Sequence, residues 1–283
     1  MKKTVIHLAV LAVAAMPAVY AHAWSAEGHR LTALVAQNHL TPVAAQNVKA
    51  ILGQDSMADV APWADEYRND HRETAPWHFT DIPGQQQRYD RMRDCPAPPL
   101  DPNAAIRDCS IDRIIYFENQ LKNPNLPKEQ KVYDLKMLIH FMGDLHQPLH
   151  NILEAKGGNN IRVVEFGSIN CDGWPCNLHA TWDHGLIDHR NLSEKKYLDL
   201  LEATIKQHHL EQEATVGNLV HWANESHAHA VDAWLPNGAL VNKAYFDKNI
   251  VVVDDQLALG GLRLANALNS IFTTPPPGTE TIK

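Results

Sequence analysis

The stretch HFMGDLHQPLH, residues 140–150, sets several polar side chains among apolar ones. It ends a helix that we expect over about 128–146, because apolar residues recur there at helical spacing at Val132, Leu135, Leu138, Ile139 and Met142. Pro148 has no backbone N–H to donate, so it should end or kink this helix. The stretch therefore predicts a buried helix that carries chemically active residues.

The remaining sequence predicts a mainly α fold in a single domain of residues 24–283 with long loops. Ile161–Phe166 has the one credible strand pattern, which we expect to form part of a small β-hairpin. A long loop is expected over 82–108, and the proline-rich tail after Phe272 should not be helical. Further helices are expected at about 25–39, 41–52, 110–121, from 178 onward, 193–208, 213–234 and 254–272.

The first 23 residues have the features of a signal peptide. Lys2 and Lys3 precede an apolar run that ends in Ala21-His22-Ala23, a small-x-small cleavage pattern typical of bacterial export. Cleavage after Ala23 would leave Trp24 with a free amine, five residues before His29. No second apolar stretch is long enough to span a bilayer, so we expect a periplasmic or secreted protein without a membrane anchor.

The composition favours a metal protein over a general polyanion binder. The formal net charge is −8, and the loss of Lys2 and Lys3 would make the chain more acidic still. An acidic protein attracts polyanions poorly. The chain also has 17 histidines, an unusually high number, and imidazole is the commonest metal-binding side chain.

The four cysteines indicate disulfides. An even number in an exported chain favours them, and pairing of sequence neighbours is the simplest of three connectivities. A thiolate zinc site is the alternative, although neither pair has zinc-ribbon spacing. We expect two loop-closing disulfides, Cys95–Cys109 and Cys171–Cys176.

Two pairs of histidine and aspartate share the same spacing: His140 with Asp144, and His179 with Asp183. Residues four apart on a helix share a face, so imidazole and carboxylate can converge on one ion. Such a pair is usually a solvated surface ion pair, but both lie among apolar residues, where polar groups without partners would cost several kcal/mol. The pairs therefore predict metal binding. His150, beyond Pro148, can serve a neighbouring ion, whereas His146 is expected to be a supporting or core histidine.

Two further motifs, PWAD at 62–65 and PWH at 76–78, each place a possible ligand near a tryptophan. Each alone is better explained as a helix cap or a loop anchor. A catalytic zinc ion uses about three protein ligands and keeps a position open for water, so nine donors without sulfur fit three catalytic zinc ions. The candidates are the Trp24 terminus, His29, Asp65, His78, His140, Asp144, His150, His179 and Asp183.

The order of these motifs resembles the single-strand-specific zinc nucleases, or type I nucleases, of fungi, plants and bacteria. The resemblance covers nearly all of the chain after residue 23 and implies the mainly helical fold that these nucleases share with bacterial zinc phospholipase C. It assigns the first zinc ion to Trp24, His29 and Asp144. The second ion, next to the first, is assigned to Asp65, His78, His140 and a bridging Asp144, and the third ion to His150, His179 and Asp183.

The resemblance further implies an endonuclease that cleaves single-stranded DNA and RNA, leaves 5′-phosphates and removes 3′-phosphates from nucleotides. Paired zinc ions lower the pKa of a shared water molecule, which Asp65 would orient. The positive charge of three dications would exceed the negative charge of the carboxylate ligands, so the site itself would be positive although the protein is acidic. Corresponding family residues imply that Phe79 stacks on an unpaired base and that Asp81 binds its edge. Asn159, which follows two glycines, is expected to close the other side of the pocket. Arg68 is placed to contact phosphate. The alternatives are a solvated surface charge for Arg68 and core packing for Phe79.

Two other functions compete with this interpretation. A phospholipase C could use the same cluster, although those enzymes have a glutamate where this chain has Asp183. A non-catalytic zinc-binding protein would need neither a bridging carboxylate nor a defined terminus. We expect a monomer whose partners are single-stranded nucleic acids and nucleotides.

Overall fold

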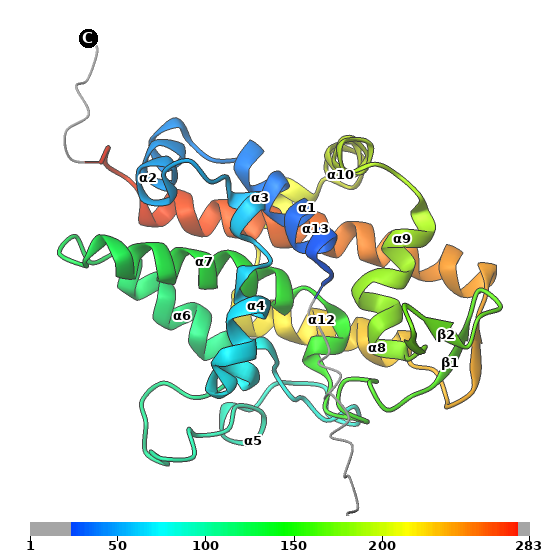
Figure 1. Ribbon diagram of the computed structural model, residues 1–283. Helices are drawn as coiled ribbons and strands as arrows, with labels where there is room; N and C mark the ends of the chain where they lie inside the picture. The colour runs from blue at the N-terminus through cyan, green and yellow to red at the C-terminus, as the bar shows by residue number, and fades with distance from the viewer. Residues whose placement is uncertain (1–23, 277–283) are drawn as a thin grey trace, which may run out of the picture.

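The longest helix, α13 (Lys243–Ile271), runs across the molecule beside α1 (Ala26–Asn38) (Figure 1). The computed structural model describes residues 24–276, so the predicted signal peptide lies outside the described residues. The mainly α prediction is confirmed. The other α-helices are α2 (Pro42–Leu52), α3 (Met57–Val60), α4 (Trp63–Asp70), α5 (Arg91–Asp94), α6 (Ser110–Leu121), α7 (Lys128–Leu145), α8 (Leu178–Ala180), α9 (Leu186–Arg190), α10 (Glu194–His208), α11 (Leu210–Glu213) and α12 (Leu219–Ala233). Short 3₁₀-helices occur at η1 (Arg72–His78) and η2 (Pro148–Asn151), and η3 (Thr181–Gly185) is a π-helical turn.

Close packing brings α1 and α13 into contact at Gly261. A Cβ added at this glycine would lie 2.6 Å from Val35 Cβ and 2.7 Å from Thr32 O, closer than packed atoms approach. Both helices contribute to two apolar clusters, one shared with α2, α6 and α7 and the other with α9 and α10. The close contact of α1 and α13 therefore joins the two clusters.

Side-chain caps set several helix starts. Ser25 accepts a hydrogen bond from Gly28 N, and Thr41 accepts one from Ala44 N with proline at the next position, as predicted. Two predicted starts are wrong, however. The helix expected from 213 begins at Leu219, because Asn218 accepts from His221 N. The helix expected from 254 begins at Lys243, because Asn242 accepts from Tyr245 N.

The strand prediction is partly wrong. β1 (Val163–Glu165) lies within the predicted strand, but it pairs in parallel with β4 (Ala239–Val241) and not in a hairpin. The small hairpin is formed instead by β2 (Asn170–Cys171) and β3 (Trp174–Pro175). A strand pattern gives the face that is buried but not the partner, which here comes from the connection between α12 and α13.

Both predicted disulfides are present, Cys95–Cys109 and Cys171–Cys176, which contradicts the thiolate zinc alternative. The first closes the long loop expected over 82–108. That loop is not wholly irregular, because it contains α5, whose start is capped by Asp90. No helix in the described part of the chain is long and apolar enough to cross a membrane.

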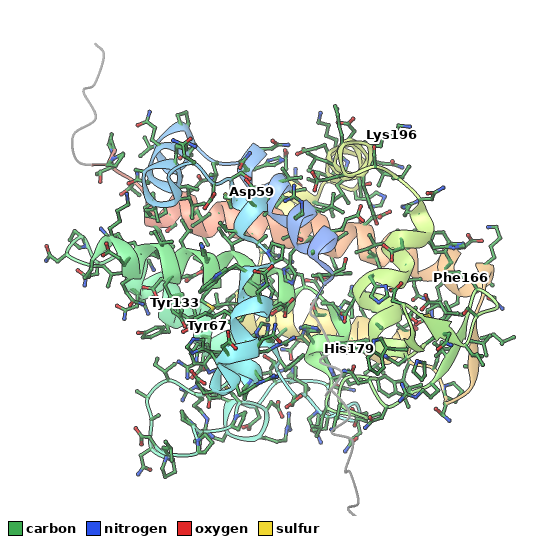
Figure 2. The ribbon with its side chains drawn as sticks, viewed as in Figure 1. Asp59, Tyr67, Tyr133, Phe166, His179 and Lys196 are labelled. Atoms are coloured by element: carbon green, nitrogen blue, oxygen red, sulfur yellow. A yellow bond between two sulfur atoms is a disulfide. The ribbon has the colours of Figure 1, made fainter. Side chains whose placement is uncertain are left out.

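Aromatic packing fixes α4 against α7. The Tyr67 and Tyr133 rings meet edge to face with centroids 5.5 Å apart, and Figure 2 shows them together. Trp63 also contacts both rings. These contacts orient α4 so that Asp65, on its first turn, faces the C-terminal half of α7.

A buried carboxyl group on α7 gives the stability of the protein a pH dependence. Asp134 Oδ1 accepts a hydrogen bond from Gln130, while Oδ2 has no hydrogen-bond partner among the described residues. Burial raises the pKa of Asp134 to about 6, above its ordinary value of 3.8, which is also its value in the unfolded chain. The stability from this group is therefore fully present below pH 3.8 and is lost as the pH rises through 6.

The substitution Asp134→Asn removes the charge and keeps the acceptor oxygen. We expect it to raise the Tm at pH 7.5, with a gain that shrinks steadily as the pH is lowered toward 4.5. Thermal unfolding of both proteins across this range measures the difference. A gain that is independent of pH would contradict the role given to this carboxyl group.

Candidate metal centre and adjoining cavity

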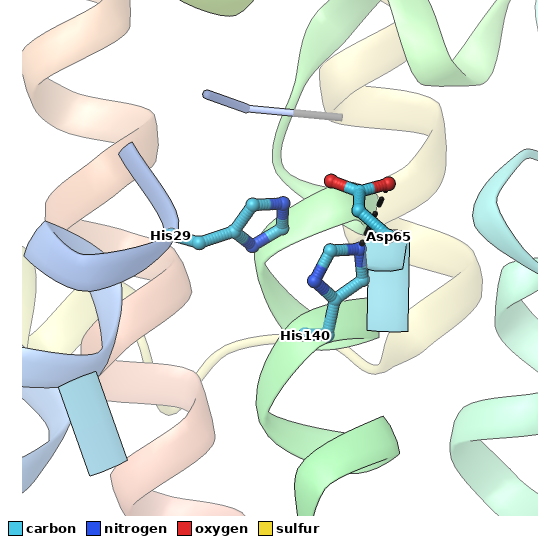
Figure 3. A group of neighbouring side chains, drawn as sticks. All are labelled: His29, Asp65 and His140. Atoms are coloured by element: carbon cyan, nitrogen blue, oxygen red, sulfur yellow. Dashed lines mark ion pairs between the residues drawn. The ribbon is translucent and has the colours of Figure 1, made fainter. Parts of the chain in front are cut away.

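The predicted ligand side chains converge from seven segments of the chain. Within each of three groups, the ligand atoms lie within 4.8 Å of one another: His29, Asp65 and His140 (Figure 3); His78, His140 and Asp144; and His150, His179 and Asp183. All eight side chains are buried. They come from α1, α4, η1, α7, η2, α8 and η3.

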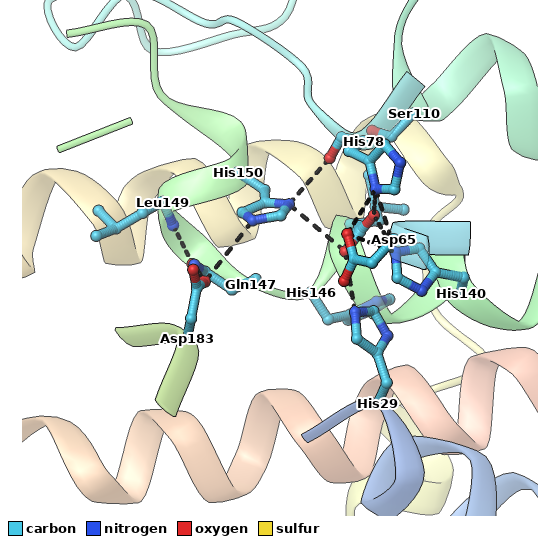
Figure 4. Close-up of polar contacts among 12 residues, drawn as sticks. His29, Asp65, His78, Ser110, His140, His146, Gln147, Leu149, His150 and Asp183 are labelled. Atoms are coloured by element: carbon cyan, nitrogen blue, oxygen red, sulfur yellow. Dashed lines mark hydrogen bonds and ion pairs between the residues drawn. The ribbon is translucent and has the colours of Figure 1, made fainter. Parts of the chain in front are cut away.

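Asp144 lies at the junction of the groups, among His29, His78, His140 and His150, whose side chains are drawn in Figure 4. Its Oδ2 is 2.9 Å from His78 Nδ1 and 3.3 Å from His140 Nε2. Its Oδ1 is 3.4 Å from His29 Nε2 and 3.6 Å from His150 Nδ1. Burial opposes its charge, but the surrounding imidazoles outweigh burial and hold the pKa of Asp144 well below its usual range. The carboxylate is therefore anionic, and each of its oxygens faces a different set of histidines.

The spacing around Asp144 Oδ2 fits a zinc ion. Ligand atoms about 2.0–2.1 Å from a tetrahedral zinc ion lie about 3.4 Å apart. His78 Nδ1 is 3.1 Å from His140 Nε2, and Asp65 Oδ1 is 3.8 Å from each of these nitrogens. Asp65 therefore faces the two histidines, and it caps no helix. His78, at the end of η1, likewise faces the centre.

The third group also has ligand spacing. His179 Nε2 is 3.4 Å from Asp183 Oδ2, and His150 Nε2 is 3.8 Å from Asp183 Oδ1. The four-residue spacing of His179 and Asp183 runs from α8 into the π-helical turn, not along one regular α-helix.

Sequence reasoning missed Gln147, which orients Asp183. The buried Gln147 amide donates to Asp183 Oδ1 over 2.5 Å, while its own carbonyl accepts from Leu149 N. The signal in the sequence that could have identified Gln147 was its position inside the 140–150 stretch, next to Pro148. His146 lies apart from the ligands and contacts Met142 O and Arg263, which agrees with the supporting role predicted for it.

The orientation of the imidazoles tests whether the centre suits a metal ion. Nδ1 of His140, His150 and His179 lies 2.8, 2.9 and 2.6 Å from the carbonyl oxygens of Ala61, His78 and Gly157, respectively. A carbonyl can only accept, so these nitrogens are donors and each Nε2 presents a lone pair to the centre. His29, His150 and His179 each have a buried Nε2 without a hydrogen-bond partner among the described residues. A metal ion would satisfy these nitrogens, so the residues fit one.

Trp24 lies at the edge of the same centre and is fully buried. The next residue, Ser25, donates its backbone N–H to Asp183 O over 2.8 Å, which ties the start of α1 to the third group. Gly143 leaves room for this arrangement, because an added Cβ would lie only 2.9 Å from His29 Nδ1.

A cavity of about 650 Å³ adjoins the centre, and all four predicted substrate-binding residues line it: Arg68, Phe79, Asp81 and Asn159. Arg68 is only 3% exposed and lies 3.1 Å from Asp65, so its interpretation as a solvated surface charge is wrong. Phe79 is half-buried, and its ring centroid is 4.8 Å from that of His150, so it forms a wall of the cavity and not a core contact.

The polar cavity residues are positioned by their neighbours. Asn159 donates its side-chain amide to Lys156 O over 2.8 Å. Asp81 is exposed to the cavity but protein surrounds it on other sides, and this burial, with the charge of Asp94, raises the pKa of Asp81 to about 6. Sequence reasoning missed three other lining residues, Lys156, Arg162 and Trp174.

The sequence of the chain is similar to those of several known nucleases. The family model described as S1/P1 Nuclease matches residues 24–273. Nuclease P1 of Penicillium citrinum is 31% identical over 280 residues, which cover 88% of this chain and 97% of that protein. Nuclease S1 of Aspergillus oryzae is 31% identical over 285 residues, covering 90% and 93%. Endonuclease 2 of Arabidopsis thaliana is 29% identical over 276 residues, covering 89% and 91%.

The buried imidazoles should remain neutral in mildly acidic solution. Burial lowers the pKa of His78 and of His179 to about 4. In metal-stripped protein, NMR titration of the ring nitrogens should therefore find both rings neutral at pH 5.5. His184 serves as an internal reference, because its contact with Asp188 raises the pKa of that imidazole. Titration of His78 and His179 at the ordinary histidine value would contradict the described burial.

Proposed function

This chain belongs to the S1/P1 nuclease family, and we propose that it hydrolyses single-stranded DNA and RNA with three zinc ions in the metal centre. The chain is a nuclease, and so a phosphodiesterase. The observation that carries the proposal is Asp144, whose two oxygens face different histidine groups at bridging distance. A storage site needs no such shared carboxylate.

The proposed ligands follow the three groups. Trp24, through its amine and carbonyl, His29 and Asp144 would hold one ion, and His150, His179 and Asp183 would hold another. Asp65, His78, His140 and the second oxygen of Asp144 would hold the remaining ion. Zinc ions bound in this way would make a water molecule nucleophilic near neutral pH and stabilise negative charge on the phosphate.

The protein residues would divide the remaining tasks. Asp65 faces the space between His78 and His140, where its carboxylate would orient the attacking water and accept its proton. Arg68 is held beside Asp65 at the cavity wall, in a position to bind a phosphate oxygen. Phe79 would stack on a base and Asp81 would hydrogen-bond its edge, with Asn159 closing the pocket. A base can stack on Phe79 only when it is not held in a duplex, which supports a preference for single strands.

The cleavage would leave 5′-phosphate ends, and the same centre would remove 3′-phosphates from mononucleotides. The enzyme would be exported to the periplasm or the medium and would act as a monomer.

Loss of the shared carboxylate tests the function directly. The substitution Asp144→Asn should reduce cleavage of single-stranded DNA by at least about 10³-fold and lower the zinc content, because two ions lose a charged ligand. Elemental analysis and rates before and after chelation measure both effects. Phosphatidylcholine vesicles, assayed in parallel, distinguish the alternatives. Turnover of lipid without cleavage of DNA would establish a phospholipase, and full activity of the variant would contradict the proposal.

The N-terminus provides a second test. Because the amine of Trp24 is proposed as a ligand, one extra residue before Trp24 should lower both zinc content and activity. A matched chain that starts at Trp24 and carries the same extra residue at its C-terminus controls for the extension. A fully active N-terminal extension with three bound ions would show that the amine is not a ligand.

A further inference from the structure

We propose that Asn151 is a positioning residue for the third group of ligands, and that its loss weakens zinc binding at this group alone. The third group consists of His150, His179 and Asp183. The inference rests on the proposed function, because it names the side chain that holds one of the proposed zinc sites in shape. The Asn151 side chain does so through backbone atoms, to which its amide donates.

The bend between α7 and η2 needs a hydrogen-bond donor from a side chain. Helix α7 ends at Leu145, whose carbonyl would ordinarily accept from the backbone N–H four residues later. That N–H belongs to Leu149 and donates to the side chain of Gln147 instead. Asn151 supplies the missing donor, because its Nδ2 donates to Leu145 O over 2.9 Å and to Gln147 O over 3.1 Å. Its side chain therefore closes the bend over residues 145–151.

Two members of the third group depend on this bend. His150 lies within it, and Gln147, also within it, donates its side-chain amide to Asp183 Oδ1 over 2.5 Å (Figure 4). The ligands proposed for the other two ions precede the bend on α7 or lie on α1, α4 and η1, with Trp24 just before α1. A change in the bend should therefore disturb one zinc site and spare the other two.

The surroundings of Asn151 show that its two donors are what the site uses. The residue is fully buried, and its Oδ1 has no hydrogen-bond partner among the described residues. A buried oxygen without a partner lowers stability, whereas both N–H groups of the amide face carbonyl oxygens, which can only accept. The backbone of Asn151 is held as well, because His227 Nδ1 on α12 lies 2.8 Å from its carbonyl oxygen.

The substitution Asn151→Asp tests the inference, because it keeps the shape of the side chain and removes both donors. The zinc-loaded protein is equilibrated with increasing concentrations of a chelator, and elemental analysis counts the zinc ions that remain. The ring nitrogens of His179, which are not hydrogen-bonded to Asn151, report by NMR whether the third group is occupied. One ion should bind about 10–100-fold more weakly than in the wild type, as is typical when a residue that supports metal ligands is lost, and the His179 signal should change with it. The affinities of the other two ions should stay within about two-fold.

Ser226→Ala is the matched control. The Ser226 hydroxyl is also buried and donates to the same Leu145 O over 2.8 Å, but it makes no hydrogen bond to Gln147. This variant should retain all three ions as the wild type does. Asn151→Ala removes the donors without adding a carboxyl group, so it should show the same selective loss and carries the test if the aspartate variant does not fold. Thermal unfolding of the zinc-free proteins measures any general loss of stability.

The outcomes separate this inference from the proposed function. Unchanged affinities for all three ions in the Asn151 variants, or an equal loss at all three, would overturn the positioning role and leave the nuclease intact. The same selective loss in Ser226→Ala would assign the effect to the Leu145 carbonyl and also overturn it. A wild type that cuts no single strand, or whose His179 never responds to zinc, would contradict the proposed function and this inference with it.

Discussion

The metal centre depends on one buried carboxylate. Asp144 is inaccessible to solvent and carries a negative charge that imidazoles from α1, η1, α7 and η2 stabilise together. A buried anion without such partners would be strongly unfavourable, so these elements must all pack around it in the native state. The approach of α1 is possible because glycine at 143 leaves space for His29. Helix α7, which carries Asp144, is therefore the element around which the other segments of the centre pack.

The backbone prepares the site before any ion binds. Carbonyl oxygens at Ala61, His78 and Gly157 orient three imidazoles, so their second nitrogens point inward in the form that binds metal. Gln147 orients Asp183 in the same manner. This arrangement leaves several buried polar atoms without protein partners, which lowers the stability of the metal-free chain. The fold thus gives up some stability to hold its ligands in position.

Local patterns in the sequence identified the helical class, both cysteine pairs and the two histidine–aspartate pairs that the structure brings together. They succeeded because His140 and Asp144, or His179 and Asp183, are near in sequence and sit among apolar residues. They failed where the partner is distant: the β1–β4 pairing joins residues 76 positions apart, such as Val163 and Ala239. The early start of α13 depends on the cap at Asn242. Lys156, Arg162 and Trp174 were not singled out, because a surface cation or tryptophan carries no pattern until the fold places it beside a cavity.

The contact between α1 and α13 joins the beginning of the folded chain to its end. Helix α1 carries His29 and begins shortly after Trp24, yet it is buried against a helix that is synthesised much later. A polypeptide that has not yet been synthesised as far as α13 therefore lacks the surface against which α1 packs. The position of His29 is thus settled late in folding, because it needs a helix from the opposite end of the described chain.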